Sequence, residues 1–331
     1  KYNTKVEGFF FPKHVNSEGF YDEHGNSDLE GAKQSELAVR ARLIAKGATG
    51  TELLKRLQEE PLNSSEAFSL ISQNDFPILE LKAQLEKVKA HGWQKSKGTP
   101  VQLIRQDGYV IAKPILDGKT DPITSLFNLP FDLKGCPMIY EQPIRNAPKG
   151  LYKIGYDPVR QDTGTSLAAI IVYKSVHIGT QHHNIIVAEY IGRLKTAEDL
   201  DRLCMYFAEY YNTTIMHENE VTGVKNFFRR LKKLHLLAVQ PDAVISKNVK
   251  KSKVARVYGC HMTGGLKEAG ERYVKEWLLS VLDYDENGNA ILVIDKIYSV
   301  RILEELIHYT RKGNYDAISA LFMCMFQVQE E

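Results

Sequence analysis

Residues 151–158 read LYKIGYDP, and this short run decides how the rest of the chain is interpreted. Its first six residues are mostly apolar, which predicts a short buried strand ending near Asp157. Two more strand-like runs follow at 166–173 (SLAAIIVY) and 184–190 (NIIVAEY), and the turn between them predicts a hairpin. The three runs therefore predict the beginning of a β-sheet.

Helix and strand signals alternate after these runs. Residues 196–199 (TAED) have the pattern of a capping box, which marks the start of a helix. Residues 213–217 predict another strand, and later helices are expected near 267–282, 299–309 and 316–327. Strands in hairpin order followed by strand–helix alternation indicate the α/β class, with a mixed sheet flanked by helices.

The first 150 residues have a different character. Apolar residues at helical spacing predict helices at 35–45, 51–58 and 78–90. Gly and Pro are then frequent, and the β-like runs between them are short. We therefore expect a mainly helical and irregular linker and connecting region over 1–150, and an α/β domain over 151–331.

Composition excludes several classes of protein. The chain has 331 residues, of which 43% are hydrophobic and 25% charged, as in soluble globular proteins. No run approaches the roughly 20 apolar residues of a membrane span, and the N-terminus lacks a signal-type apolar run. The sequence does not begin with Met, so we expect a fragment or a processed product. The four cysteines form no CxxC pair, which predicts a reducing compartment and neither a zinc site nor a disulfide framework.

Positive charge is concentrated in one segment, Lys225–Arg256. Its only acidic residue is Asp242, although the net charge of the whole chain is just +2. Such a concentration suggests a polyanionic partner, and the alternative is a solvated helix face followed by a lysine-rich loop. Its ten basic residues are Lys225, Arg229, Arg230, Lys232, Lys233, Lys247, Lys250, Lys251, Lys253 and Arg256.

Three acids occupy positions where chemistry is often found. Asp157 and Glu218 each end a predicted strand, and Asp316 opens the last predicted helix. Ligands often bind beyond the carboxyl ends of strands in α/β sheets. Carboxylates brought together repel one another unless a cation neutralises them, and oxygen donors suit Mg²⁺ or Mn²⁺.

Each acid also has an ordinary structural interpretation. Asp157 precedes Pro158 and could be a turn residue. Glu218 could be a surface acid beyond a strand, and Asp316 could be a helix N-cap. Spacing alone does not show that the three converge.

Several segments, in order, resemble those of phage terminase large subunits. Residues 155–158 (GYDP) and 164–166 (GTS) resemble the first nuclease motif of that family, 218–224 (ENEVTGV) the second and 313–321 (GNYDAISAL) the third. The resemblance runs from about residue 58 to the C-terminus. It includes three supporting segments, 60–68 (EPLNSSEAF), 140–143 (YEQP) and 259–267 (GCHMTGGLK).

The resemblance implies a ribonuclease-H-like fold and a metal-dependent endonuclease that cuts concatemeric viral double-stranded DNA during packaging. Asp157, Glu218 and Asp316 would be the catalytic residues and would hold two Mg²⁺ or Mn²⁺ ions. The implied partners are double-stranded DNA, the packaging ATPase domain of the same protein, the portal and the small terminase subunit, in the cytoplasm of an infected cell. The residues expected to hold the DNA backbone are Lys225, Arg229, Arg230, Lys247, Lys250, Lys251, Lys253 and Arg256.

The chain departs from the family pattern at two places. Tyr315 stands where many members carry the first of two acids. Gly164 and Thr165 occupy the neighbourhood of another family acid, so Asp162, the nearest acid, is a further candidate metal ligand. Glu220 competes with Glu218 for the second motif.

The sequence also bears on three alternative functions. No GxxxxGK[ST] loop is present, since residues 47–51 (GATGT) lack the lysine, and the chain is not expected to pump DNA by itself. A resolvase or transposase would use the same arrangement of acids on a different DNA substrate. A DNA-binding or portal-docking module would carry the acids for structural reasons and would cleave nothing with any cation.

Overall fold

The computed structural model describes residues 10–46, 50–63, 66, 74–159, 161–162, 164, 166–176, 183–241 and 257–329. Its internal contacts divide the chain into two units, Lys1–Asn74 and Asp75–Glu331. Within the segment 1–150 that we expected to be a linker and connecting region, β1 (Thr99–Gln106), β2 (Tyr109–Pro114) and β3 (Met138–Ile139) belong to the same sheet as the later strands.

The regular structure of the first unit, where it is described, is mainly helical. Asp28 caps its longer helix by accepting the N–H of Gly31 at 2.9 Å. Glu36 then accepts hydrogen bonds from Arg40 and Arg56, and the bond to Arg56 joins the two helices. The elements are η1 (Lys13–Asn16), α1 (Leu29–Ala45) and α2 (Gly50–Glu59). Of these, α1 and α2 confirm the helices predicted at 35–45 and 51–58, and η1 was not predicted.

The second unit contains a mixed sheet and most of the helices. In its described part the sheet has seven strands in the order β2-β1-β3-β6-β5-β4-β7, and β8 pairs with β9 separately. The strands are β1 (Thr99–Gln106), β2 (Tyr109–Pro114), β3 (Met138–Ile139), β4 (Tyr152–Asp157), β5 (Ala168–Lys174), β6 (Ile185–Gly192), β7 (Ile215–His217), β8 (Val281–Tyr284) and β9 (Ala290–Leu292). The helices are α4 (Ile78–His91), α5 (Trp93–Lys97), α6 (Ala197–Tyr210), α7 (Thr222–Arg230), η2 (Leu234–Leu236), α8 (Gly264–Leu278), η4 (Val293–Lys296), α9 (Val300–His308) and α10 (Asp316–Val328).

The strand directions identify the type of sheet. β4, β5 and β6 are successive antiparallel neighbours, and β7 returns through α6 to lie parallel to β4 on the opposite side from β5. An antiparallel three-strand run followed by a parallel strand beside the first is the arrangement expected of a ribonuclease-H-like sheet. The expected fold class, a mixed sheet flanked by helices, is therefore confirmed.

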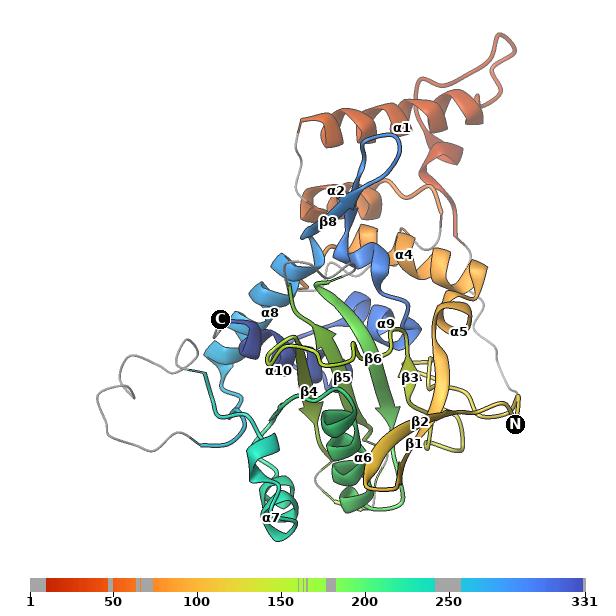
Figure 1. Cartoon of the computed structure of the whole chain (residues 1–331). Coiled ribbons are helices and arrows are strands. Elements are labelled where there is room, and N and C mark those ends of the chain that lie inside the picture. Colours follow the sequence, from red (N-terminus) through yellow and green to blue (C-terminus); the bar gives the residue numbers. More distant parts are fainter. Residues whose placement is uncertain are drawn as a thin grey trace, which may run out of the picture. The chain divides into compact units, whose positions relative to one another are not determined.

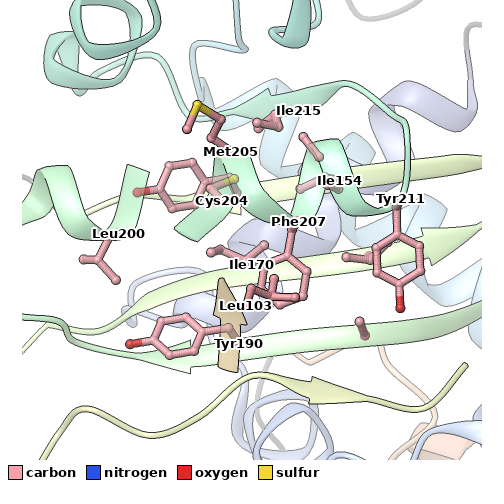
Figure 2. Close-up of a cluster of buried hydrophobic side chains, with 14 of the residues drawn as sticks. Leu103, Ile154, Ile170, Tyr190, Leu200, Cys204, Met205, Phe207, Tyr211 and Ile215 are labelled. Atoms are coloured by element: carbon pink, nitrogen blue, oxygen red, sulfur yellow. The ribbon is translucent and has the colours of Figure 1, made fainter. Parts of the chain in front are cut away.

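One face of the sheet packs against α6 (Figure 2). The cluster shown there includes Ile154 and Ile170 from the sheet together with Phe207 and Tyr211 near the C-terminal end of α6. These side chains are at most 1% exposed, so the cluster is a true core. The predicted start of α6 is confirmed, because Thr196 accepts the N–H of Asp199.

The opposite face packs against α10 (Figure 1). A Cβ atom at Gly155 in β4 would lie 1.8 Å from the carbonyl oxygen of Ala320, so only glycine permits this approach. The Gln327 side chain donates to the carbonyl of Ile154 at 2.7 Å. Most residues of α10 are buried, and a helix buried on most sides is expected to have a largely apolar sequence such as this one. Among the described residues, no helix is long and apolar enough to cross a membrane.

Candidate active site

Asp157 and Glu218 lie side by side at the ends of two parallel strands. The register of β4 and β7 pairs Tyr156 with His217, and the Glu218 N–H donates to the Tyr156 carbonyl at 3.2 Å. Because alternate residues of a strand share a face, this register places the two acids on the same side of the sheet. Both acids lie on the same side of the sheet as Gly155, and this side faces α10.

Asp316 reaches the same place from α10. It is the first residue of the helix, whereas Tyr315 is the N-cap residue and makes no capping bond with its side chain. The Asp316 carboxylate instead accepts from the Asn314 side chain at 3.1 Å. The N-cap interpretation of Asp316 is therefore wrong. The close contact of α10 with β4 brings this carboxylate beside the end of the strand.

The three acids line one cavity of about 440 Å³. Asp157 and Asp316 are 8% and 7% exposed, and Glu218 is half-buried. The cavity also has cationic and aromatic walls, formed by Arg193, Lys267, Arg311, Tyr309 and Tyr315. It is thus a concave, partly buried site with opposite charges facing one space, which is a common form of active site.

Burial and mutual repulsion determine the protonation of these acids. Burial raises the pKa of Asp157 well above its usual range, and the negative charges of Asp316 and Glu218 raise it further. Burial also raises the pKa of Asp316 to about 6, against the opposing effect of the Arg301 guanidinium. Negative charge is therefore costly here unless a proton or a cation compensates it.

The donors suit a divalent cation in their chemistry. Among the described residues, no group of three or more His, Cys, Asp or Glu side chains is already gathered closely enough to hold a metal ion. Mutual repulsion among the three carboxylates opposes such gathering. The oxygen donors, their shared cavity and the raised pKa of Asp157 nonetheless fit a hard cation such as Mg²⁺ or Mn²⁺.

The two other candidate acids have different surroundings. Asp162 accepts the N–H of Ala197 at 2.8 Å, which caps the start of α6, and it lines a different cavity. Glu220 borders the active-site cavity, but it is exposed and its carboxylate lies 3.6 Å from the imidazole of His261. The structure thus brings Glu218, but not Asp162, next to Asp157.

Three cations at the cavity, Arg193, Lys267 and Arg311, were not identified as site residues by sequence analysis. Arg193 donates to the carbonyls of Gln161 and Ser166, both at 2.5 Å, and so closes the loop that follows Asp157. Lys267 projects from the second turn of α8. Arg193 left no sequence signal, because its partners are backbone carbonyls. The only signal for Lys267 was its position just after the start of a predicted helix.

Only part of the predicted DNA-binding segment can be placed. The Lys225 ammonium lies 5.8 Å from the centre of the Tyr258 ring, and Arg230 pairs with Glu198 at 2.8 Å. Arg229 is exposed. The residues that lie outside the described part of the chain are Lys247, Lys250, Lys251, Lys253 and Arg256.

Comparisons with known proteins identify similar solved structures but no family. No protein-family model and no curated protein matches the chain. The large terminase nuclease from thermophilic phage G20c with bound zinc is similar, with 16% identity and a TM-score of 0.34 over 62% of this chain and 91% of that chain. The same nuclease with bound magnesium has 12% identity and a TM-score of 0.32, over 62% and 90% of the two chains. Similarity at this level assigns no function. What the fold and the cavity define is a class: an α/β protein in which carboxylates from the ends of two neighbouring parallel strands and from the start of a helix line one cavity.

Proposed function

We propose that this chain is the nuclease part of a viral terminase large subunit, a divalent-metal-dependent endonuclease that cuts concatemeric double-stranded DNA during packaging. The observation that carries the proposal is that Asp157, Glu218 and Asp316 line one cavity. These residues come from β4, the end of β7 and α10, far apart in the sequence. The choice of a viral DNA concatemer as substrate rests on the resemblance of the three motifs to terminases.

The carboxylates would act as metal ligands. Asp157 lies beside Glu218, and the charge of Asp316 also acts on it. We therefore expect Asp157 to be the metal ligand that lies between the other two. A divalent cation bound at this position would supply an activated water and would stabilise the leaving oxygen of the phosphodiester. Asp157 would have to lose the proton that burial favours before it could serve as a ligand, so cleavage should increase with pH in the range where that proton is lost.

The basic residues would hold the DNA backbone without reading bases. Lys267 and Arg193 border the cavity and would face a phosphate next to the carboxylates. Arg229 and Arg230 are exposed on the last turn of α7. Contacts of this kind position nucleic acid and carry little sequence information. The portal, the small terminase subunit and the packaging ATPase domain are proposed as protein partners on the same resemblance.

The decisive experiment is digestion of supercoiled plasmid with Mg²⁺, Mn²⁺ or excess chelator. Wild-type protein should cut with either metal and not with chelator, and a folded Asp157→Ala protein should not cut. Asp162→Ala is the matched control: it removes an acid close in sequence that caps α6 and does not line the cavity. It should keep its nuclease activity.

The same experiment separates the alternatives. A DNA-binding or docking module would shift the plasmid in a gel but would cut nothing with any cation. A resolvase or transposase would prefer branched junctions or defined end sequences over plain duplex. Near-normal cleavage by folded Asp157→Ala would contradict the proposed site.

A further inference from the structure

A fully buried carboxylate outside the cavity lies against the start of α10. Glu305, on α9, is 0% exposed. Its Oε2 atom accepts the N–H of Ala317 at 2.9 Å and approaches the N–H of Ile318 at 3.3 Å. These are the second and third residues of α10, directly after Asp316. The first N–H groups of a helix have no partner within the helix, so Glu305 satisfies two of them.

These bonds perform the usual task of an N-cap side chain. An N-cap residue normally accepts from the N–H of the second or third helical residue. Tyr315 occupies the N-cap position here, and its side chain makes no capping bond. Because Glu305 does so from a neighbouring helix, the Asp316 carboxylate is not needed to cap its own helix, and it lines the cavity.

Arg301 holds Glu305 in place. Its Nε donates to Glu305 Oε1 at 2.7 Å, one turn away on α9, and its Nη1 donates to the Ser125 carbonyl at 2.5 Å. Both side chains of the pair are at most 5% exposed. Each Glu305 oxygen thus has its own partner, Oε1 with Arg301 and Oε2 with α10. The pair connects α9 to the turn that carries Asp316.

We infer that Glu305 is a positioning residue for the active site: by capping α10 from α9 it holds the Asp316 carboxylate beside Asp157. This inference rests on the proposed function, because it assigns Glu305 an effect on metal binding. Groups that orient metal ligands from outside the coordination sphere typically change metal affinity by about 10–100-fold when removed. Glu305 would act through backbone amides and touch neither metal nor DNA.

The test separates the capping role from the charge pair. Both variants carry Arg301→Met, which removes the partner charge, and they differ only at Glu305. Glu305→Gln keeps an oxygen that can accept from Ala317 and Ile318, whereas Glu305→Met has a similar length and no such acceptor. The readouts on the folded full chain are Mn²⁺ affinity by electron paramagnetic resonance and the NMR signal of the Asp316 carboxyl carbon without metal.

The Gln variant should bind Mn²⁺ close to wild type, and the Met variant at least about tenfold more weakly. Hydrogen exchange at Ala317 and Ile318 should be about fivefold faster in the Met variant, as expected for a lost cap. Equal Mn²⁺ affinity in the two folded variants would overturn the inference. If the Met variant does not fold, Glu305→Asp replaces it. The shorter Asp side chain keeps the negative charge but moves the carboxylate oxygen away from the N–H groups of α10. A Mn²⁺ affinity equal to that of the wild type would again overturn the inference.

The same measurements give a different result if the proposed function is wrong. If wild-type protein binds no Mn²⁺, the metal-dependent nuclease is wrong, and the Asp316 signal alone decides whether Glu305 positions that carboxylate. A signal that moves in the Met variant and not in the Gln variant supports positioning. A signal that is the same in both refutes it.

Discussion

A methyl group at Gly155 would lie 1.8 Å from the carbonyl oxygen of Ala320, so β4 and α10 contact each other through their backbones. This contact determines where the first turn of α10 lies relative to the end of β4. The distance between the Asp316 and Asp157 carboxylates therefore depends on a residue that has no side chain.

Gly155→Ala should destabilise the protein and disturb the active site together. The added methyl group meets backbone that cannot rotate away, and overpacking of this kind typically costs about 1–3 kcal/mol. Urea unfolding measures the loss. Gly223→Ala is the matched control, because its Cβ would have no neighbour closer than 4.0 Å and it lies in α7. Ala in a helix should be neutral there or stabilise by up to about 1 kcal/mol. Equal stabilities of the two variants would show that α10 can shift at no cost.

Glu218→Gln should abolish cleavage, and Glu220→Gln should leave most of it. Glu218 follows the end of β7 and lies next to Asp157 in the strand register, whereas Glu220 is exposed near His261. Plasmid cleavage with Mn²⁺, measured on folded proteins, compares the two directly. The opposite result, with Glu220 essential and Glu218 dispensable, would reverse the assignment.

Asp157→Asn should make the folded protein more stable while it abolishes cleavage. The amide has nearly the same shape but carries no charge, so the burial cost and the repulsion from Asp316 and Glu218 both disappear. Thermal unfolding at pH 7 without added metal measures this gain. A lower melting temperature would mean that the charge of Asp157 stabilises the fold.

Asp201 lies away from the active site and should make the stability of the folded protein depend on pH. It is 4% exposed and accepts from the Tyr156 hydroxyl at 2.8 Å. Burial raises its pKa to about 6, although the Tyr156 hydrogen bond opposes this shift. The folded pKa exceeds the unfolded value, so the folded state binds this proton more tightly. Stability is therefore lost as pH rises from about 4 to about 6.

Asp201→Asn should remove this loss, because asparagine can still accept from Tyr156 and does not ionise. The gain above pH 6 should be at most about 3 kcal/mol, since each pKa unit corresponds to roughly 1.4 kcal/mol. Urea unfolding across the pH range measures the difference between the two proteins. Parallel pH profiles would show that the wild-type loss arises elsewhere.

DNA binding should be sequence-tolerant and sensitive to salt. Each phosphate neutralised contributes about −0.9 to the slope of log affinity against log salt concentration. Replacing Lys250, Lys251 and Lys253 with alanine should therefore flatten the slope by about 2–3 units if all three contact phosphates. Titration with one duplex at several salt concentrations provides the measurement.

The control for this experiment is a triple alanine variant at exposed lysines of the first unit, Lys33, Lys46 and Lys55. It changes net charge by the same amount, so its slope should stay close to wild type. If both variants have the wild-type slope, the DNA path lies elsewhere. The segment around Lys250 would then become a candidate surface for docking another protein.

Much of the sheet could be predicted from local sequence. The runs that became β4, β5, β6 and β7 are short and apolar because each strand is buried. The start of α6 was predictable as well, since capping depends on residues close together in the chain. The place of β1, β2 and β3 in this sheet was not predictable, because they join it through the pairing of β3 with β6, and pairing of distant segments leaves no local signal.

The sequence by itself determined which residues could do chemistry: three acids at the ends of two strands and the start of a helix, and a segment of concentrated positive charge. Only the tertiary structure decided which acids meet. The register of β4 and β7 placed Glu218 beside Asp157, and Asp162 became a helix cap instead. The physical reason is that strand and helix signals depend on neighbouring residues, whereas the meeting of side chains depends on long-range packing. The contact of Gly155 with Ala320 and the capping of α10 by Glu305 are two such contacts.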